Sequence, residues 1–210
     1  MKHLVIDTST PNLFFAIVEN NDIKYCYDDI IDSDLSSKFM VIVDEAFKKC
    51  NILPNEIDKV FISCGPGSFT GIRIGMTFAK VFCFSLKKDL IPFSSLEAFI
   101  SSSNSENSVA LIDARRGFVF RGVYNKDLNS VIDDGYVSLD NLLSELKSLK
   151  NYDVFSYNEF EDFDVKKPSI DAVKIINKHI NDKPINPHEL KPKYLKNTEA
   201  EEKLKNDNWN

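Results

Sequence analysis

The sequence predicts an α/β protein in which one unit of strands and helices occurs twice. Residues 4–7 (LVID) and residues 109–113 (VALID) both form short apolar runs that end in aspartate. Each run is followed by a second apolar segment and then by a polar turn, at residues 20–22 (NND) and 125–127 (NKD). The same order of segments recurs after about a hundred residues, which indicates an internal duplication.

The first half has alternating strand and helix signals. Three apolar runs separated by short turns predict three strands, and their close spacing requires antiparallel neighbours. Ser33 or Asp34 is expected to cap the helix that follows, and Ser94 or Ser95 to cap the last helix of this half. The expected elements in order are strands 3–7, 13–19 and 23–27, a helix at 34–50, a strand at 59–64, a helix at 69–87, a strand at 90–93 and a short helix after Ser95.

The polar segment 101–108 (SSSNSENS) is the expected boundary between two halves, residues 1–103 and 109–210. The second half is reduced. After residues 109–113 its expected elements are strands at 118–124, 131–138 and 153–155 and helices at 139–149 and 169–180. Prolines in the tail from residue 181 predict an extended segment that lies over the surface.

The repeated order β-β-β-α-β-α, with a first strand that ends in Asp7-Thr8, resembles the plan of the actin, Hsp70 and acetate kinase superfamily. The predicted fold class is therefore α/β, with two duplicated halves of that type and a reduced second half. The resemblance implies a nucleotide held between the halves, with the aspartate after the first strand close to its phosphates.

The composition is that of an ordinary globular protein, with 210 residues, 43% hydrophobic and 28% charged. A net charge of −6 argues against a broad surface that binds nucleic acid. Lys191, Lys193 and Lys196 are the candidates for a local basic patch, and a solvated surface is the alternative.

The four cysteines, Cys26, Cys50, Cys64 and Cys83, have no C-x-x-C spacing. They predict reduced thiols rather than a disulfide framework or a zinc site. Asp7 interrupts the N-terminal apolar run, so no signal peptide is expected, and the apolar runs are too short to predict a membrane span. The expected location is the cytoplasm, away from membranes.

Residues 65–75 (GPGSFTGIRIG) carry four glycines between an expected strand and an expected helix. Such a turn exposes backbone N–H groups that suit an anion, and the alternative is a tight turn that lets the helix lie close to the sheet. The spacing matches neither the P-loop nor the dinucleotide fingerprint. Residues 7–9 are either phosphate contacts or an Asx turn. The candidate nucleotide or phosphate contacts are Asp7, Thr8, Ser9, Gly65, Gly67, Ser68, Thr70 and Asp113.

Both long helices carry features that suggest contact with a partner. Small residues recur at 71, 75, 79 and 83 in one stripe, which permits the close approach of another backbone. The run 39–43 (FMVIV) is too long for one face to bury, so either one or two of its residues stay exposed or a second apolar face meets a partner. Arg73 lies near the positive end of its helix, where a carboxylate or anion would offset its charge.

The combination of these motifs resembles the bacterial TsaB family, also called YeaZ. The segments that carry the resemblance are 4–9 (LVIDTS), 65–75, 94–98 (SSLEA), 112–120 (IDARRGFVF) and 192–196 (PKYLK). The resemblance implies a subunit of the machinery that makes threonylcarbamoyladenosine next to the anticodon of tRNA. It also implies two partners, the catalytic subunit TsaD, which has a metal-binding H-x-x-x-H motif, and the small ATPase TsaE.

The residues agree with a member that has no metal. The histidines, His3, His179 and His188, have no H-x-x-x-H spacing, so neither a metal site nor a catalytic residue is predicted. The resemblance implies a scaffold or activating subunit that pairs with TsaD through its two long helices, forms a homodimer when alone and contacts tRNA only indirectly. The predicted partner interface consists of Phe39, Met40, Val43, Phe47, Gly71, Ile72, Arg73, Gly75, Met76 and Ala79.

The alternative function is a small-molecule kinase or ATPase of the same superfamily. It requires a complete phosphate-binding set in both halves, and the second half offers residues 113–115 (DAR) without a clear glycine-rich motif after them. No cofactor is therefore expected on this chain alone, and ATP or ADP stays open at the level of the complex.

Overall fold

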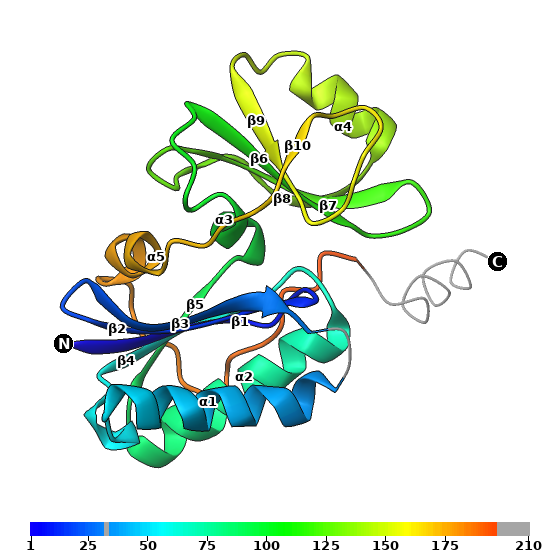
Figure 1. Ribbon diagram of the computed structural model, residues 1–210. Coiled ribbons are helices and arrows are strands. Elements are labelled where there is room, and N and C mark those ends of the chain that lie inside the picture. The colour runs from blue at the N-terminus through cyan, green and yellow to red at the C-terminus, as the bar shows by residue number, and fades with distance from the viewer. Residues whose placement is uncertain (32–33, 197–210) are drawn as a thin grey trace.

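The computed structural model describes residues 1–31 and 34–196, which form two five-stranded sheets (Figure 1). The first sheet has the order β3-β2-β1-β4-β5 and the second has the order β10-β9-β6-β7-β8. The strands of the first sheet are β1 (Lys2–Asp7), β2 (Asn12–Glu19), β3 (Asp22–Ile30), β4 (Lys59–Ser63) and β5 (Asp89–Phe93). Those of the second are β6 (Asn107–Asp113), β7 (Phe118–Asn125), β8 (Ser130–Ser138), β9 (Tyr152–Phe155) and β10 (Val165–Lys166).

The two sheets have the same topology, which confirms the predicted duplication and the α/β fold of the actin, Hsp70 and acetate kinase superfamily. From its other edge the second sheet has the order β8-β7-β6-β9-β10, which matches the first strand by strand. The first strand of each half pairs antiparallel with the next strand and parallel with the fourth strand of its half. The sequence locates eight of these strands to within two residues, since each is a short apolar run between turn residues. It ended β3 three residues too early, at residue 27, and it did not predict the two-residue strand β10.

The helices differ between the halves. In the first half α1 (Leu35–Cys50) and α2 (Phe69–Leu86) cover one face of the first sheet (Figure 1). The shorter helices are η1 (Pro54–Glu56), α3 (Ser95–Phe99), α4 (Leu139–Leu146) and α5 (Ala172–His179). In the second half residues 156–164 connect β9 to β10 without a helix, so this half lacks a counterpart of α2 within the described chain. The missing helix is the reduction that the sequence predicted for the second half.

Each half contributes one helix that packs against the sheet of the other half. The helix α3 packs against β6 and β7 of the second sheet, and α5 packs against β1, β2 and β3 of the first. One buried apolar cluster therefore joins both halves, with Phe14 of β2, Phe99 of α3 and Ile175 of α5 among its members. The first sheet ends at Phe93 and the second begins at Asn107, within the segment expected to be a boundary, and the packing crosses this segment because these helices are exchanged.

The segment 101–108 is not an exposed linker. Ser101, Ser103 and Ser108 are all at least 93% buried, and β6 begins at Asn107. Their hydroxyls are satisfied locally, because Ser101 Oγ donates to the Ala98 carbonyl at 2.7 Å and Ser108 Oγ donates to Ser103 Oγ at 2.8 Å. A serine run reads as polar in the sequence, but such short hydroxyl side chains are buried readily when they are hydrogen-bonded.

The expected helix caps are made at some ends and not at others. Ser94 caps α3 by accepting the Leu96 N–H at 3.2 Å. Asp34 occupies the cap position of α1 but makes no side-chain cap, since its backbone adopts a left-handed conformation with φ 54°. Ser33, the other expected cap, lies outside the described residues.

The tail after α5 is extended, as predicted, and it runs back along the first half (Figure 1). The Ile185 N–H donates to the Leu90 carbonyl and the Lys193 N–H donates to the Cys64 carbonyl, at 2.9 and 2.8 Å. Of the described helices, α2 alone is long and apolar enough to cross a membrane, a test that the core helix of a soluble protein also passes. Here α2 packs against β4 and β5.

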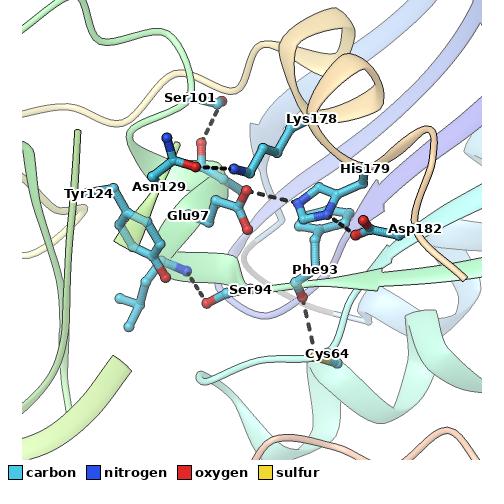
Figure 2. Close-up of polar contacts among 12 residues, drawn as sticks. Cys64, Phe93, Ser94, Glu97, Ser101, Tyr124, Asn129, Lys178, His179 and Asp182 are labelled. Carbon is cyan, nitrogen blue, oxygen red and sulfur yellow. Dashed lines mark hydrogen bonds and ion pairs between the residues drawn. The ribbon is translucent and has the colours of Figure 1, made fainter. Parts of the chain in front are cut away.

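A partly buried histidine, His179, links the two exchanged helices (Figure 2). His179 at the end of α5 contacts Glu97 of α3 through Nε2 at 2.8 Å, and its Nδ1 lies 2.6 Å from Asp182. Burial by itself lowers the pKa of His179, but the hydrogen bonds and charges of Glu97 and Asp182 outweigh burial and raise it above its usual value. The protonated form is therefore favoured in the folded state.

We predict that His179→Gln destabilises the protein more in mild acid than in mild base. Because the folded-state pKa is raised, the stabilisation from His179 is fully present below the unfolded pKa and is lost as the pH rises through the folded value. The free energy of unfolding, measured by urea titration, is expected to fall by about 1 kcal/mol at about pH 5.5 and by much less at about pH 8.5. The control is His188→Gln on the exposed part of the tail, and an equal loss at both pH values would contradict the prediction.

Candidate functional site

The glycine-rich turn and α2 lie in direct contact with the turn between β1 and β2. A Cβ atom on Gly71 would lie 2.1 Å from the carbonyl oxygen of Thr8, and one on Gly75 would lie 2.3 Å from Thr8 Oγ1. The Thr8 hydroxyl donates to the Gly71 carbonyl at 2.7 Å. Gly71 is therefore required because the helix backbone there touches the backbone of the strand turn, and Gly75 because the Thr8 side chain fills the space that a side chain would need.

This contact corrects the predicted role of the small-residue stripe. Gly71, Gly75 and Ala79 face the chain's own first sheet and are buried, so they are not the surface that another subunit approaches. The backbone approach that the stripe permits is intramolecular. A bulky residue at Gly75 would disturb the fold itself, so such a variant does not test the binding of a partner.

A cleft of about 1010 Å³ lies between the two halves. Of the candidate nucleotide or phosphate contacts, Ser9, Gly67, Ser68, Thr70 and Asp113 line it. Asp7, Thr8 and Gly65 are buried and are not among its lining residues. The second half contributes groups that the sequence did not single out, among them Tyr157, Asn158 and Lys167.

The two aspartates that end the first strands of the halves have the same local geometry. Asp7 Oδ1 accepts the Ser9 N–H at 2.7 Å, and Asp113 Oδ1 accepts the Arg115 N–H at 2.7 Å. Both are Asx turns, the alternative that the sequence left open. Burial raises the pKa of Asp7, partly offset by hydrogen bonding to Ser9. The two carboxyls differ in access, since Asp7 is 2% exposed and Asp113 is open to the cleft.

Much of the glycine-rich turn is bonded within the chain. The Ser68 N–H donates to the Ser9 carbonyl at 2.6 Å, and Ser68 Oγ accepts the Gly71 N–H at 3.3 Å as the cap of α2. Ser95 Oγ donates to the Pro66 carbonyl. These contacts match the tight-turn alternative, in which the turn lets α2 lie close to the first sheet, and they also tie the start of α3 to the turn.

The outer side of α1 and α2 carries a second hollow, an apolar groove of about 840 Å³. We call it the α1/α2 groove. Its floor and walls include Met40 of α1 and Phe69, Phe78, Val81 and Phe82 of α2. Met40, Phe69 and Val81 are 52%, 51% and 61% exposed, which is high for large apolar side chains grouped in one place.

A neighbouring hollow of about 600 Å³ shares Met40, Phe78 and Phe82 with the α1/α2 groove and extends along α1 toward Leu53. Leu53 is 64% exposed. The apolar surface is therefore continuous over both helices. Exposed apolar surface of this kind marks a contact with another molecule more often than do isolated exposed residues.

The predicted interface residues divide between the two sides of these helices. Met40 and Arg73 line the groove and are exposed. Phe39, Val43, Phe47, Ile72 and Met76 are at least 91% buried in the first core, although Phe39 also contributes to the wall of the groove. Within the run 39–43, Met40 and Val41 remain exposed, as the count of apolar residues required. Four further groove residues, Phe69, Phe78, Val81 and Phe82, were not predicted from the sequence, although the spacing of three and four residues from Phe78 to Val81 and Phe82 is a helical signal.

The thiols have no sign of reactivity. Burial raises the pKa of Cys64 to about 11 and that of Cys83 to about 12, far from the range in which a thiolate forms at neutral pH. All four cysteines are free. Among the described residues no group of three or more His, Cys, Asp or Glu side chains is placed to hold a metal ion.

Similarity to known proteins agrees with the fold described above. A family model described as "TsaD: tRNA N6-adenosine threonylcarbamoyltransferase" matches residues 30–179. The chain is 33% identical over 152 residues to the tRNA threonylcarbamoyladenosine biosynthesis protein TsaB of Bacillus subtilis, a match that covers 70% of this chain and 66% of that protein. The chain belongs to the TsaB (YeaZ) family.

Other relatives bear the same family name. The TsaB of Haemophilus influenzae is 30% identical over 121 residues, which cover 56% of this chain and 51% of that protein. The matches thus span between half and two thirds of these curated relatives. The solved structure of YeaZ from Pseudomonas aeruginosa superimposes with a TM-score of 0.79 over 92% of this chain and 99% of that chain, at 16% identity. This likeness shows that the TsaB fold extends over nearly the whole described chain.

We predict that Gly71→Ala destabilises the protein by about 2 kcal/mol, because the added methyl group would meet the Thr8 carbonyl and force the backbones apart. The free energy of unfolding from a urea titration measures the loss. Ser85→Ala, on the exposed side of the same helix, is the matched control and is expected to change stability by less than about 0.5 kcal/mol. Equal stability of the Gly71→Ala variant and the wild type would contradict the close backbone contact.

Proposed function

We propose that this protein is a non-catalytic scaffold or activating subunit in the biosynthesis of threonylcarbamoyladenosine on tRNA. Two curated relatives of at least 30% identity carry that process in their names, and the matching family model is named after the threonylcarbamoyltransferase. The partner proposed is TsaD, with TsaE as the third subunit and a homodimer when the chain is alone. The proposal places the chain in the cytoplasm and leaves most of the tRNA contact to TsaD, in keeping with a net charge of −6.

The observation that carries the proposal is the continuous apolar surface over α1 and α2. Met40, Val81 and their neighbours form a surface that a monomer leaves in water at a cost, since about 25 cal/mol is gained for each Å² of apolar surface that is covered. The helices themselves are fixed to the first sheet by their inner faces. A rigid apolar helix pair is well suited to pack against a second helix pair.

The proposal of a non-catalytic role is supported by the chemistry of the described groups. Burial raises the pKa values of the Cys64 and Cys83 thiols, and the partly buried His179 of α5 is held between two carboxylates rather than beside a nucleophile. The proposed contribution to the reaction is therefore to bind and position the partner subunit.

We predict that Met40→Asp and Val81→Asp each abolish co-purification with the TsaD of the same organism and shift the free chain from dimer to monomer. On docking, a carboxylate at either position would be buried without a partner. The affinity falls tenfold for about every 1.4 kcal/mol of binding free energy that this burial costs. Pull-down and analytical ultracentrifugation measure the two outcomes. Thermal unfolding of the variants is expected to stay unchanged because both side chains are exposed.

The matched control is Val131→Asp. Val131 is a large apolar residue of β8 that is 46% exposed and lies away from the groove, so this change is expected to leave both assemblies intact. Wild-type assembly of both groove variants would contradict the proposed docking surface.

The cleft between the halves favours a second candidate function, the binding of ATP or ADP. Its volume of about 1010 Å³ is at the upper end of the usual range for small-molecule sites, and Asp113, Arg115 and Lys167 line it. A small-molecule kinase or ATPase of the superfamily would use this place. Two observations argue against independent activity. In the glycine-rich turn the Ser68 N–H already donates to the Ser9 carbonyl, and at the end of β1 the Asp7 side chain is buried, with its Oδ1 already accepting the Ser9 N–H.

We predict that calorimetric titration of ATP into the purified chain gives no binding tighter than about 1 mM and no turnover. The same titration into the complex with TsaD tests whether a nucleotide belongs to the assembly. Binding of ATP to the chain alone with turnover, reduced by Asp113→Asn, would overturn the scaffold proposal in favour of the kinase or ATPase.

A further inference from the structure

The C-terminal tail passes Phe69, a wall residue of the α1/α2 groove, before its described course ends at Lys196 beside Tyr136 of β8. Its Lys193 N–H donates to the Cys64 carbonyl at 2.8 Å, next to the glycine-rich turn. Lys193 Nζ lies 2.8 Å from Asp134 of β8, whose side chain is only 1% exposed and also accepts the Ser94 hydroxyl at 2.5 Å. The tail is thus attached at residue 193 to both halves, and the next residue, Tyr194, has a fixed place.

Tyr194 packs against Phe69, the first residue of α2. Its ring stacks against that of Phe69, with the ring centroids 5.5 Å apart and an angle of 20° between the planes. Both rings are open to solvent, with exposed fractions of 45% for Tyr194 and 51% for Phe69. Phe69 is at the same time a wall of the α1/α2 groove. The tail therefore enlarges the exposed apolar surface with an aromatic side chain that neither α1 nor α2 supplies.

The same pair of rings holds Arg73. The Cζ atom of Arg73 lies 3.8 Å from the centroid of the Phe69 ring, and its Nε donates to the Tyr194 hydroxyl at 3.1 Å. Both of these partners are uncharged. A guanidinium held flat through Nε and one face presents its two terminal amino groups as a fork, the geometry that binds a carboxylate with two parallel hydrogen bonds.

Arg73 is also the one charged side chain among the described residues that line the α1/α2 groove. A single fixed cation in an apolar groove selects for a single anion on whatever fills the groove, since an unpaired charge would be costly to bury there. Arginine and aromatic side chains are also the groups that most often dominate binding energy at protein interfaces.

We infer that Tyr194, Phe69 and Arg73 form an anchor at one end of the docking surface, in which Tyr194 positions Arg73 to bind a carboxylate side chain on a helix of the docked TsaD subunit. This inference rests on the proposed function, which supplies the docking surface itself. Tyr194 is a positioning residue, placed in turn by Lys193, and Arg73 is the residue that contacts the partner.

The test is isothermal titration calorimetry with the TsaD of the same organism. Arg73→Ala and Tyr194→Ala are each expected to raise the dissociation constant about tenfold. The double variant is expected to bind about as weakly as Arg73→Ala alone, because both substitutions remove one shared contact and the effects do not add. Arg73→Lys is expected to be weakened as well, since an ammonium group lacks the planar fork.

The matched control is His188→Ala. His188 is another exposed tail residue whose ring packs against α2, with its centroid 4.8 Å from that of Phe84, but neither residue lines the groove. Its removal is expected to leave the affinity unchanged. Tyr194→Phe keeps the stacked ring and removes only the hydroxyl that accepts from Arg73. It is expected to weaken binding with an unchanged melting temperature. This variant keeps the inference testable if Tyr194→Ala fails to fold.

The outcomes separate this inference from the proposed function. If Met40→Asp prevents binding while Arg73→Ala, Tyr194→Ala and Tyr194→Phe bind as the wild type does, the docking surface stands and the anchor is wrong. If Met40→Asp binds normally, the proposed docking surface itself fails. A weaker dependence of the affinity on salt in Arg73→Ala than in the wild type would support the carboxylate contact, and an unchanged dependence would overturn it.

Discussion

The contact of α2 with the turn between β1 and β2 fixes the orientation of α2, and therefore the position of the side chains on its exposed side. Thr8 occupies the space that side chains at Gly71 and Gly75 would need, and its hydroxyl bonds to the backbone of the helix. Since the helix cannot rotate without driving a side chain into this turn, its opposite side is fixed as well. Phe69 and Arg73 are thereby held at the rim of the groove, and Val81 faces outward along it.

The relation between the halves depends on exchange of short elements rather than on a broad sheet-to-sheet interface. The helices α3 and α5 each pack on the other half's sheet, and His179 of α5 contacts Glu97 of α3. The tail adds a third connection through Lys193 and Asp134. The loss of a helix between β9 and β10 leaves these connections intact, because none of them uses that segment. A reduced second half is therefore compatible with a firmly held pair of sheets.

The sequence located the strands and the two long helices well because apolar periodicity and turn residues are local signals. It also foresaw that residues 39–43 could not all be buried, a matter of counting around a helix. It failed where the deciding partner is distant in the chain. The stripe at Gly71 and Gly75 is covered by Thr8, more than sixty positions away, and Arg73 is held by Tyr194, at a separation of 121 residues. The serines of 101–108 were read as a linker because their buried partners are likewise invisible to a local pattern.

The sequence by itself determined the duplicated α/β plan, the resemblance to the TsaB family and the presence of glycines where backbones come close. It could do so because each rests on residue type and spacing along the chain. Only the tertiary structure decided which side of each helix faces the core, which cleft residues remain accessible and what the tail does at the groove. Those properties depend on what packs against each side chain, and packing is a property of the folded chain as a whole. The same glycines that indicated a surface for a partner proved to be the place where the chain contacts itself.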